Sequence, residues 1–395
     1  MGFSLLVFKV QFKLKTCWYL VKRLRSYLRS TQLSTRYELK ADSLRIAFKH
    51  NKKRANMDTS NAIDSQFSRK LAQSRGRLSP VRIDSVSQEI MHCRSHLEEP
   101  LRSAFDHHFK KSGKLLRANL ALRAAQASDL KSQSCIRWAA SVELLHNASL
   151  VHDDVCDDDS DRRGITSVSE MYGREIAICL GDAMIALSSL LLAQDYALQH
   201  TLTAHNLAIL KLSAGQAAEF STLSYPTWAA YEKLVEGKTT PLISLPLLGL
   251  NPIGQNSSES RLITQYFSDT SIAFQIMNDI QNIDQGKQLT SPASDLRELR
   301  PNAVIAKFYE GLPDLEKKLF TRSKSGNKFA ENDARLNFWW EQILLSDSLA
   351  TTRQLLGDKL SRSQRIFSAL SNKNKDILQP FDHWLRKSYT ILSSH

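Results

Sequence analysis

The sequence is poor in the two residues that most often interrupt regular structure. Its 395 residues include 14 Gly and 10 Pro, about 6% of the chain against roughly 12% in an average protein. So few chain-breaking residues argue against a β-sandwich, a collagen-like chain and a Gly/Pro-rich disordered chain. Because 42% of the residues are hydrophobic, the chain can bury a sizeable core, and we expect an all-α protein.

Cysteines are also few, and their spacing matches no common metal or disulfide pattern. The five residues are Cys17, Cys93, Cys135, Cys156 and Cys179, and no two of them stand at C-x-x-C spacing. This distribution argues against a zinc site and a disulfide framework and suits a reducing compartment. We therefore expect a cytoplasmic protein.

Most of the chain lacks an excess of charge of either sign. Residues 1–80 hold 18 Lys and Arg against 4 Asp and Glu, so the formal net charge of +13 belongs to this segment. The remaining residues, with 35 basic and 36 acidic side chains, are nearly neutral. A nucleic-acid-binding protein would carry a basic stripe on its folded domain, so we expect no nucleic-acid partner.

The first residues form a basic, amphipathic pattern. No acidic residue precedes Glu38, and apolar residues from Phe3 to Leu28 recur at steps of three or four, which predicts one face of a helix. Lys interrupts this segment too often for a bilayer span, which needs about 20 mostly apolar residues. We therefore divide the chain into an N-terminal extension, residues 1–56, and a helical domain, residues 57–395.

Three interpretations of the extension remain open. A basic amphipathic helix can lie on an anionic membrane surface, which would make the protein a peripheral membrane protein. Organellar transit peptides are also Arg-rich and poor in acidic residues. The extension can also be disordered or untranslated, since Met57 offers an internal start.

From about residue 81, the hydrophobic pattern predicts successive helices joined by short polar stretches. The clearest candidates cover residues 139–151, 175–198, 207–222, 231–250 and 261–283. Two of these segments, the first and the last, end in clusters of carboxylates or carboxamides. These clusters are the first candidates for a functional site.

A dense group of carboxylates follows the first of these helices. Six acidic residues stand between Asp153 and Asp161, and they repel one another unless a cation compensates. Asp153 and Asp157 lie four residues apart and so share a helix face, which suits Mg²⁺ bound together with substrate phosphates. Arg162 and Arg163 follow, and guanidinium groups match phosphate oxygens. A solvated acidic turn would explain D-D-x-x-D alone, but the full run D-D-x-x-D-x4-R-R-G predicts a diphosphate site.

At this point the sequence resembles a known family, the trans-isoprenyl diphosphate synthases, over roughly residues 85–310. Each motif is weak alone, but together they follow the family's order. The matching motifs are Gly113-Lys114-Leu115-Leu116-Arg117, Glu143-Leu144-Leu145-His146, the Asp-rich run with its arginine pair, Gly181-Asp182, Gly215-Gln216, Lys238-Thr239 and Phe274-Gln275-Ile276.

The resemblance implies roles for the matching residues. Those implied to bind the diphosphates of isopentenyl diphosphate and of an allylic diphosphate are Lys114, Arg117, His146, Arg162, Arg163 and Arg300. Those implied to take part in catalysis are Asp153, Asp154, Asp157, Lys238, Thr239 and Gln275. The implied metal ligands are Asp153, Asp154, Asp157, Asn278, Asp279 and Asn282, which would hold three Mg²⁺ ions.

The resemblance also implies an isoprenoid-synthase-type helical bundle around a central cavity, with the two Asp-rich helices facing each other, and a homodimer. In the implied reaction, Mg²⁺ and basic residues stabilise a departing diphosphate. The double bond of isopentenyl diphosphate then attacks the allylic cation, and a proton is lost. No nucleophilic triad is needed.

The second Asp-rich motif departs from the family's D-D-x-x-D. It reads Asn278-Asp279-Ile280-Gln281-Asn282, and the neutral Asn278 is a weaker metal ligand. One family lysine aligns with Ser291, with Lys287 four residues earlier, and a later one aligns with Arg300, which keeps the charge.

These departures leave two alternatives to a synthase. The start of the second motif resembles the N-D-x-x-S-x-x-x-E metal motif of class I terpene cyclases, although Asn282 and Gly286 fail to match it. A non-catalytic subunit of a heteromeric synthase is the other alternative, but it would predict damage to the intact first motif. The retained residues of the isopentenyl diphosphate site favour condensation.

Small residues precede the first Asp-rich motif. In the family, the product grows along this helix, and side chains just before the motif limit its length. Ala148 and Ser149 stand five and four residues before Asp153, and Leu145 lies one turn further back. Because longer chains bury more apolar surface, we expect a linear product of C20 or longer.

Overall fold

A computed structural model of the chain describes residues 82–221, 224–250, 257–288, 291–322 and 334–393. These residues belong to one compact unit, which spans Arg75–His395. The extension predicted at residues 1–56 lies outside the described residues. The interpretations of its function therefore stay predictions.

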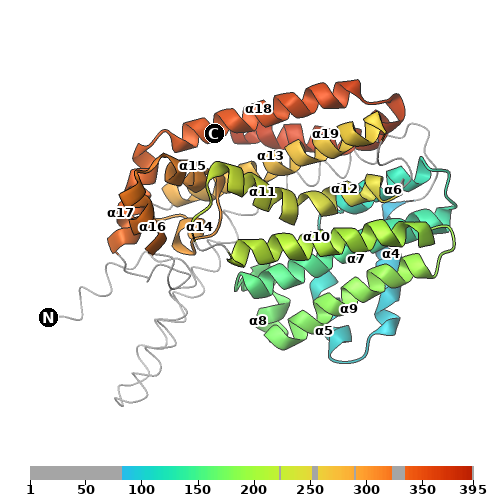
Figure 1. Cartoon of the computed structure of the whole chain (residues 1–395). Coiled ribbons are helices and arrows are strands. Elements are labelled where there is room, and N and C mark those ends of the chain that lie inside the picture. Colours follow the sequence, from blue (N-terminus) through green and yellow to red (C-terminus); the bar gives the residue numbers. More distant parts are fainter. Residues whose placement is uncertain (1–81, 222–223, 251–256, 289–290, 323–333, 394–395) are drawn as a thin grey trace, which may run out of the picture. The chain divides into compact units, whose positions relative to one another are not determined.

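The described residues form sixteen α-helices and one short two-stranded ribbon (Figure 1). The helices are α4 (Ile83–Cys93), α5 (Leu101–Phe109), α6 (Leu116–Gln126), α7 (Ser132–Cys156), α8 (Val168–Tyr172), α9 (Arg174–Ala193), α10 (Leu202–Ser221), α11 (Trp228–Lys238), α12 (Thr240–Leu248), α13 (Ser258–Gln288), α14 (Ser294–Arg297), α15 (Ala303–Gly311), α16 (Asp314–Arg322), α17 (Ala334–Leu345), α18 (Ser348–Ala369) and α19 (Asn372–Ser393). Single 3-10 turns lie at Arg94–His96 and Gln199–Thr201. Strands β1 (Asp161–Arg162) and β2 (Ile165–Thr166) pair antiparallel. The all-α prediction is confirmed.

Two predicted helices end earlier than their hydrophobic pattern indicated. The segment expected at residues 231–250 is divided at Thr239 into α11 and α12, with Pro241 in the first turn of α12. Because proline lacks an N–H group and its ring clashes with the carbonyl four residues earlier, it favours a break in the preceding helix. The helix expected at residues 175–198 ends at Ala193. The break at Thr239 leaves Lys238 at the end of α11.

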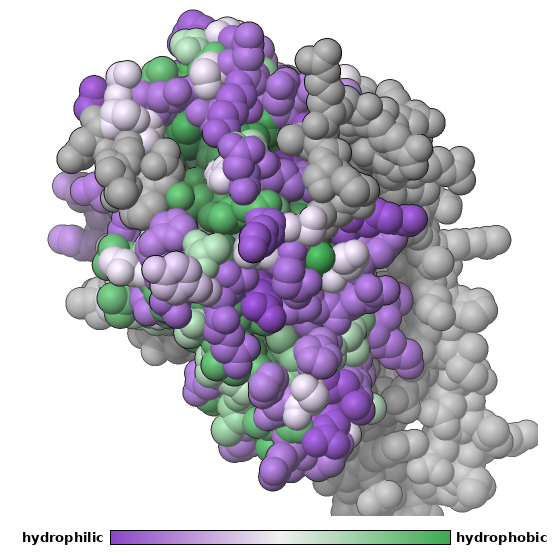
Figure 2. All heavy atoms as spheres, turned by 90° about the vertical axis from the view of Figure 1, so that its right-hand side faces the viewer, coloured by the Kyte–Doolittle hydropathy of each residue, from purple (hydrophilic) through white to green (hydrophobic). Residues whose placement is uncertain are grey.

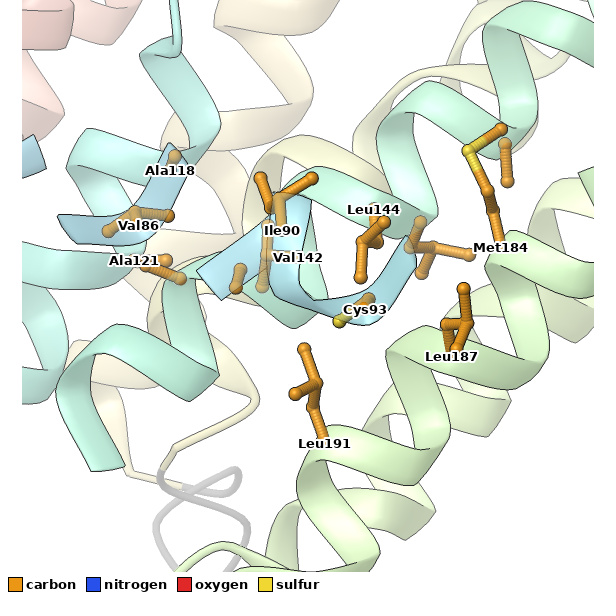
Figure 3. Packing of buried hydrophobic residues seen from close by; sticks show 14 of the residues in the cluster. Val86, Ile90, Cys93, Ala118, Ala121, Val142, Leu144, Met184, Leu187 and Leu191 are labelled. Atoms are coloured by element: carbon orange, nitrogen blue, oxygen red, sulfur yellow. The ribbon is translucent and has the colours of Figure 1, made fainter. Parts of the chain in front are cut away.

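Helix α7 lies in the core of the first half of the domain and carries the first Asp-rich motif at its end. It packs against α4, α6, α9 and α12. Figure 3 shows Ile90, Leu144 and Met184, from α4, α7 and α9, within this cluster. Burying an aliphatic side chain of this size contributes about 1.5–3 kcal/mol. This packing fixes α7, and so the place of the motif.

The second half of the domain is built around α13, which carries the second motif. Ser257 caps this helix, since its Oγ accepts the N–H of Ser260. The buried Asp269 of α13 pairs with Arg362 of α18, whose Nε lies 2.7 Å from Oδ2. Tyr266 of α13 donates a hydrogen bond to Asp382 of the C-terminal helix α19. Figure 1 shows α13 beside α18 and α19.

The surface of the domain is of mixed character. Figure 2 shows one face, on which hydrophilic residues cover most of the area and smaller hydrophobic areas lie between them. The four cysteines among the described residues are free thiols.

Candidate active site

The carboxylates of the first Asp-rich motif are met by two basic side chains from the second half of the domain. Oδ1 of Asp153 lies 3.9 Å from Nζ of Lys238. Oδ2 of Asp157 lies 3.7 Å from Nη1 of Arg300, whose Nη2 donates a hydrogen bond to the backbone carbonyl of Asp157. Burial raises the pKa of the Asp153 carboxyl group, and the charge of Lys238 opposes that rise. The structure thus brings together four residues that the sequence predicted for one site.

The position of Lys238 depends on a close approach of two helices. A Cβ atom at Gly215 of α10 would lie 2.5 Å from the carbonyl carbon of Gly237 in α11. Only glycine permits this backbone contact. It places Glu219 of α10 beside Lys238, with Oε2 and Nζ 3.1 Å apart. Gly215, the first residue of the G-Q motif, therefore helps to set the position of the lysine.

The two arginines that follow the motif point to different partners. Arg162 binds Asp154 through Nε at 2.8 Å and through Nη2. Asp154 is only 1% exposed, so its buried carboxylate fixes that guanidinium. Arg163 and Gly164 both have positive φ values and form the turn between β1 and β2. The two arginines thus have different partners, Asp154 for Arg162 and Asn147 for Arg163.

Arg163 belongs to a second basic cluster, together with the predicted residues Arg117 and His146. Nη2 of Arg163 donates to Oδ1 of Asn147 at 3.4 Å. A Cβ atom at Gly113 would lie 2.7 Å from the same Nη2, so the glycine lets the guanidinium approach the backbone. Nη1 of Arg117 lies 3.1 Å from Nε2 of His146.

His146 is neutral in this cluster. Its burial, reinforced by the charge of Arg117, holds the pKa of the imidazole well below its ordinary value. Because an arginine can only donate, Nε2 is the acceptor and Nδ1 carries the proton. Nδ1 has no hydrogen-bond partner among the described residues. It is therefore a buried donor without a protein partner in the described part of the chain.

Sequence reasoning assigned no role to the buried carboxylate that supports this cluster. Glu143 is 2% exposed, and its oxygens accept hydrogen bonds from the backbone N–H of Ala118 and the side chain of Asn147. Burial raises the pKa of Glu143, whereas the charges of Arg117 and Arg163 lower it. A carboxylate inside an otherwise apolar helix, three residues before a histidine, is the sequence signal that could have revealed this residue.

In the second motif, Asp279 and Asn278 have different surroundings. The side chain of Asn278 is exposed, whereas Asp279 is only 2% exposed. Oδ2 of Asp279 accepts hydrogen bonds from the Tyr231 hydroxyl and the Ala303 N–H, and Oδ1 accepts one from Gln275. In this arrangement both oxygens of Asp279 are occupied by protein donors, which ties α11, α13 and α15 together.

Asn282, the last residue of the second motif, holds the segment that leads to Arg300. Its Nδ2 donates to Oγ of Ser294, and its Oδ1 accepts the N–H of Asp295. Asn302 caps α15 and donates to both Asp295 and the carbonyl of Asp279. The metal roles predicted for Asn278, Asp279 and Asn282 stay predictions.

The site thus combines a carboxylate cluster paired with Lys238 and Arg300 and a separate basic cluster of Arg117, His146 and Arg163. Thr239 lies at the junction of α11 and α12, half-buried beside Lys238. Cationic groups of this kind can bind and stabilise diphosphates. The arrangement suits two anionic ligands, one held through the carboxylates and one by the arginines.

Comparisons with known proteins agree with this chemistry. The family model described as polyprenyl synthetase matches residues 98–335. A geranylgeranyl diphosphate synthase of Saccharolobus solfataricus is 32% identical over 244 residues, which cover 59% of this chain and 73% of that enzyme. A decaprenyl-diphosphate synthase of Dictyostelium discoideum is 26% identical over 288 residues, which cover 72% of this chain and 61% of that enzyme.

Solved structures confirm the fold. A decaprenyl diphosphate synthase from Rhodobacter capsulatus has a TM-score of 0.68 at 20% identity, over 83% of this chain and 99% of that one. A geranylgeranyl pyrophosphate synthetase from Pyrococcus horikoshii has a TM-score of 0.66 at 21% identity, over 84% and 99%. The motifs, the fold and the family match together show that this chain belongs to the polyprenyl synthetase family, whose members are prenyl diphosphate synthases.

Proposed function

We propose that the protein condenses an allylic diphosphate with isopentenyl diphosphate and releases a linear prenyl diphosphate of C20 or longer. The observation that carries this proposal is the division of the basic side chains between two sets of partners. Lys238 and Arg300 meet the carboxylates of Asp153 and Asp157, while Arg117 lies in the second cluster. Two diphosphates need two such groups, whereas a cyclase uses only one diphosphate substrate.

The donor set of the first motif fits Mg²⁺. Asp153 and Asp157 supply hard oxygen ligands, but the described residues contain no group of three or more His, Cys, Asp or Glu side chains that could hold a metal by itself. Mg²⁺ takes one or two carboxylates together with phosphate oxygens and water, so the substrate would complete the coordination. When bound, the metal would neutralise charge on the departing diphosphate.

The side chains would divide the remaining work. Lys238 and Arg300 would bind the allylic diphosphate as its negative charge grows. Arg117, Arg163 and the Nδ1–H group of His146 would bind the diphosphate of isopentenyl diphosphate and so orient its double bond. Because His146 is neutral, it would donate a hydrogen bond without acting as an acid.

The proposed product length rests on the small side chains before Asp153. Ala148 is fully buried, and Leu145, one turn earlier, is 2% exposed. Neither Ala148 nor Ser149 projects a bulky group from this turn of α7. Since relatives include farnesyl as well as geranylgeranyl and decaprenyl synthases, the length requires a direct measurement.

We also propose a homodimer, formed through α9 and α10. Among the described residues, α9 is the one helix long and apolar enough to cross a membrane, yet only 44% of its apolar window is buried within the chain. Apolar side chains stay exposed on both helices: Ile178, Leu190, Leu207, Leu210 and Phe220. A second copy would cover this surface by the hydrophobic effect, and the molecular mass in solution tests this.

The function is tested with purified protein, Mg²⁺, isopentenyl diphosphate and each allylic diphosphate from C5 to C20. Products are extracted before and after phosphatase treatment. We expect linear prenols only after phosphatase. Hydrocarbons or cyclic alcohols without phosphatase would indicate a cyclase, and no product from any substrate would indicate a non-catalytic subunit.

A further inference from the structure

The C-terminal helix α19 contacts the residues that begin the proposed isopentenyl diphosphate site. Nζ of Lys114 lies 5.7 Å from the ring centroid of Trp384. Trp384 is 6% exposed, whereas Lys114 is exposed. Ammonium groups are attracted to the faces of aromatic rings within about 6 Å, and most strongly to tryptophan. The indole therefore restricts where this lysine can place its charge.

The same indole lines a cavity next to Arg117. The cavity has a volume of about 30 Å³, and its walls include Arg117, Phe274, Phe381 and Trp384. Nε of Arg117 and Nε1 of Trp384 are both buried, and neither has a hydrogen-bond partner among the described residues. A cavity that holds a water molecule needs about 10–15 Å³, so this one accommodates an oxygen acceptor. The side chains of both donors line the cavity, and a buried donor without a partner favours an acceptor nearby.

Further contacts fix Trp384 relative to both halves of the site. Its ring centroid lies 5.5 Å from that of Phe274, the residue before Gln275. Helix α6 is tied to α19 separately, since Nη2 of Arg123 donates to the carbonyl of Asp376 at 2.5 Å. Trp384 is therefore held in place independently of Lys114.

We propose that Trp384 is a positioning residue of the isopentenyl diphosphate site. Its ring holds the Lys114 ammonium group near Arg117, and its N–H donates to an oxygen acceptor shared with Arg117. The proposal rests on the proposed function for the substrate that these residues bind. It extends the site beyond the family match, which ends at residue 335, to the last helix of the chain.

Three variants test this role: Trp384→Leu, Trp384→Phe and the control Phe381→Leu. Phe381 lies one turn earlier on α19 and lines the same cavity, but it has no N–H donor. A cation–π contact corresponds to about 3- to 30-fold in affinity. We expect Trp384→Leu to raise the KM for isopentenyl diphosphate by about this factor, with the allylic KM within twofold. Trp384→Phe should lie between Trp384→Leu and the wild type.

Binding measured without turnover separates this proposal from the proposed function. Calorimetric titration with isopentenyl diphosphate alone should show the same loss of affinity in Trp384→Leu. Indole fluorescence should change on titration of the wild type and much less in Trp384→Phe. If the protein binds this ligand but condenses nothing, the proposed function fails while the role of Trp384 stands.

Two results would overturn the role of Trp384. One is an equal rise of both KM values, or none, in variants whose thermal unfolding matches the wild type. The other is an equal rise of the isopentenyl diphosphate KM in Phe381→Leu, which would show a general packing effect. If Trp384→Leu does not fold, the role of Trp384 is tested with Trp384→Phe alone. The two KM values and the fluorescence titration of that variant are then judged by the same criteria.

Discussion

The hydroxyl of Tyr231 in α11 donates a 2.6 Å hydrogen bond to Oδ2 of Asp279 in α13. Burial, together with the charge of Asp295, raises the pKa of Asp279 to about 7 despite this bond. The one aspartate retained in the second Asp-rich motif thus links helices within the domain. From this environment we expect the stability of the domain to depend on pH.

The first prediction concerns this pH dependence. Because the pKa of Asp279 is higher in the folded than in the unfolded state, the folded protein holds an extra proton between about pH 4 and 7. The contribution of Asp279 to the free energy of unfolding is therefore fully present below pH 4 and is lost as the pH rises through 7. Each pH unit changes the free energy of unfolding by about 1.4 kcal/mol at most.

Urea unfolding of the wild type and of Asp279→Asn, from pH 4 to pH 7, measures this effect. We expect the stability of the wild type to fall, relative to the variant, as the pH rises. Tyr231→Phe, which removes a donor to the ionised carboxylate, should steepen the fall. Parallel curves for the wild type and Asp279→Asn would contradict the prediction.

The second prediction concerns His146. Replacing it with alanine removes the proposed Nδ1–H donor and the acceptor of Arg117. A hydrogen bond to a charged group is worth about 1.5–3 kcal/mol, so His146→Ala should raise the KM for isopentenyl diphosphate by roughly 10- to 100-fold. Steady-state kinetics with each substrate varied in turn provide the measurement. An effect confined to the allylic substrate would place His146 in the other subsite.

The third prediction concerns product length. Ala148 is fully buried in α7, five residues before Asp153. Ala148→Phe should block the growing chain and shorten the product by at least one isoprene unit while sparing turnover. Chromatography of the dephosphorylated products gives the distribution, and Ser149→Ala serves as a control that adds no bulk. If Ala148→Phe left the distribution unchanged, the limit to chain growth would lie elsewhere.

The fourth prediction concerns the N-terminal extension. Each Lys or Arg near an anionic surface contributes about 1 kcal/mol to membrane binding, and the extension is rich in both. Deleting residues 1–56 should leave the activity intact and weaken sedimentation with phosphatidylserine-containing liposomes. Equal binding by the full-length and shortened proteins would exclude the membrane interpretation.

Local patterns were sufficient to predict the helical fold, whereas most of the candidate site came from the resemblance to the synthase family. The i, i+4 spacing predicted Asp153 and Asp157 on one helix face; in the structure Asp157 caps the end of α7 and its N–H donates to the carbonyl of Asp153. The structure adds the contacts to Lys238 and Arg300. The break at Thr239 was missed because a continuous apolar pattern outweighed Pro241, although proline at that position begins a new helix.

Other features depend on contacts between distant segments. The motif predicts Asp279 to be a metal ligand. Only the packing of α11 and α15 shows that its carboxylate accepts hydrogen bonds from Tyr231 and Ala303. Glu143 stands in a matching motif that assigned it no role, and Trp384 lies outside the matching motifs. Their places beside Arg117 and Lys114 follow from the packing of distant segments.

We propose that the first Asp-rich motif supports condensation with isopentenyl diphosphate. The most direct measurement supplies labelled isopentenyl diphosphate, farnesyl diphosphate and Mg²⁺ to the wild type and to Asp153→Ala, and follows label in phosphatase-released linear prenols. We expect labelled products of C20 or longer from the wild type and a loss of at least 100-fold in the variant, on the order of the effect of removing a key electrostatic group. Equal labelling by both proteins, or wild-type product that carries no label, would contradict it.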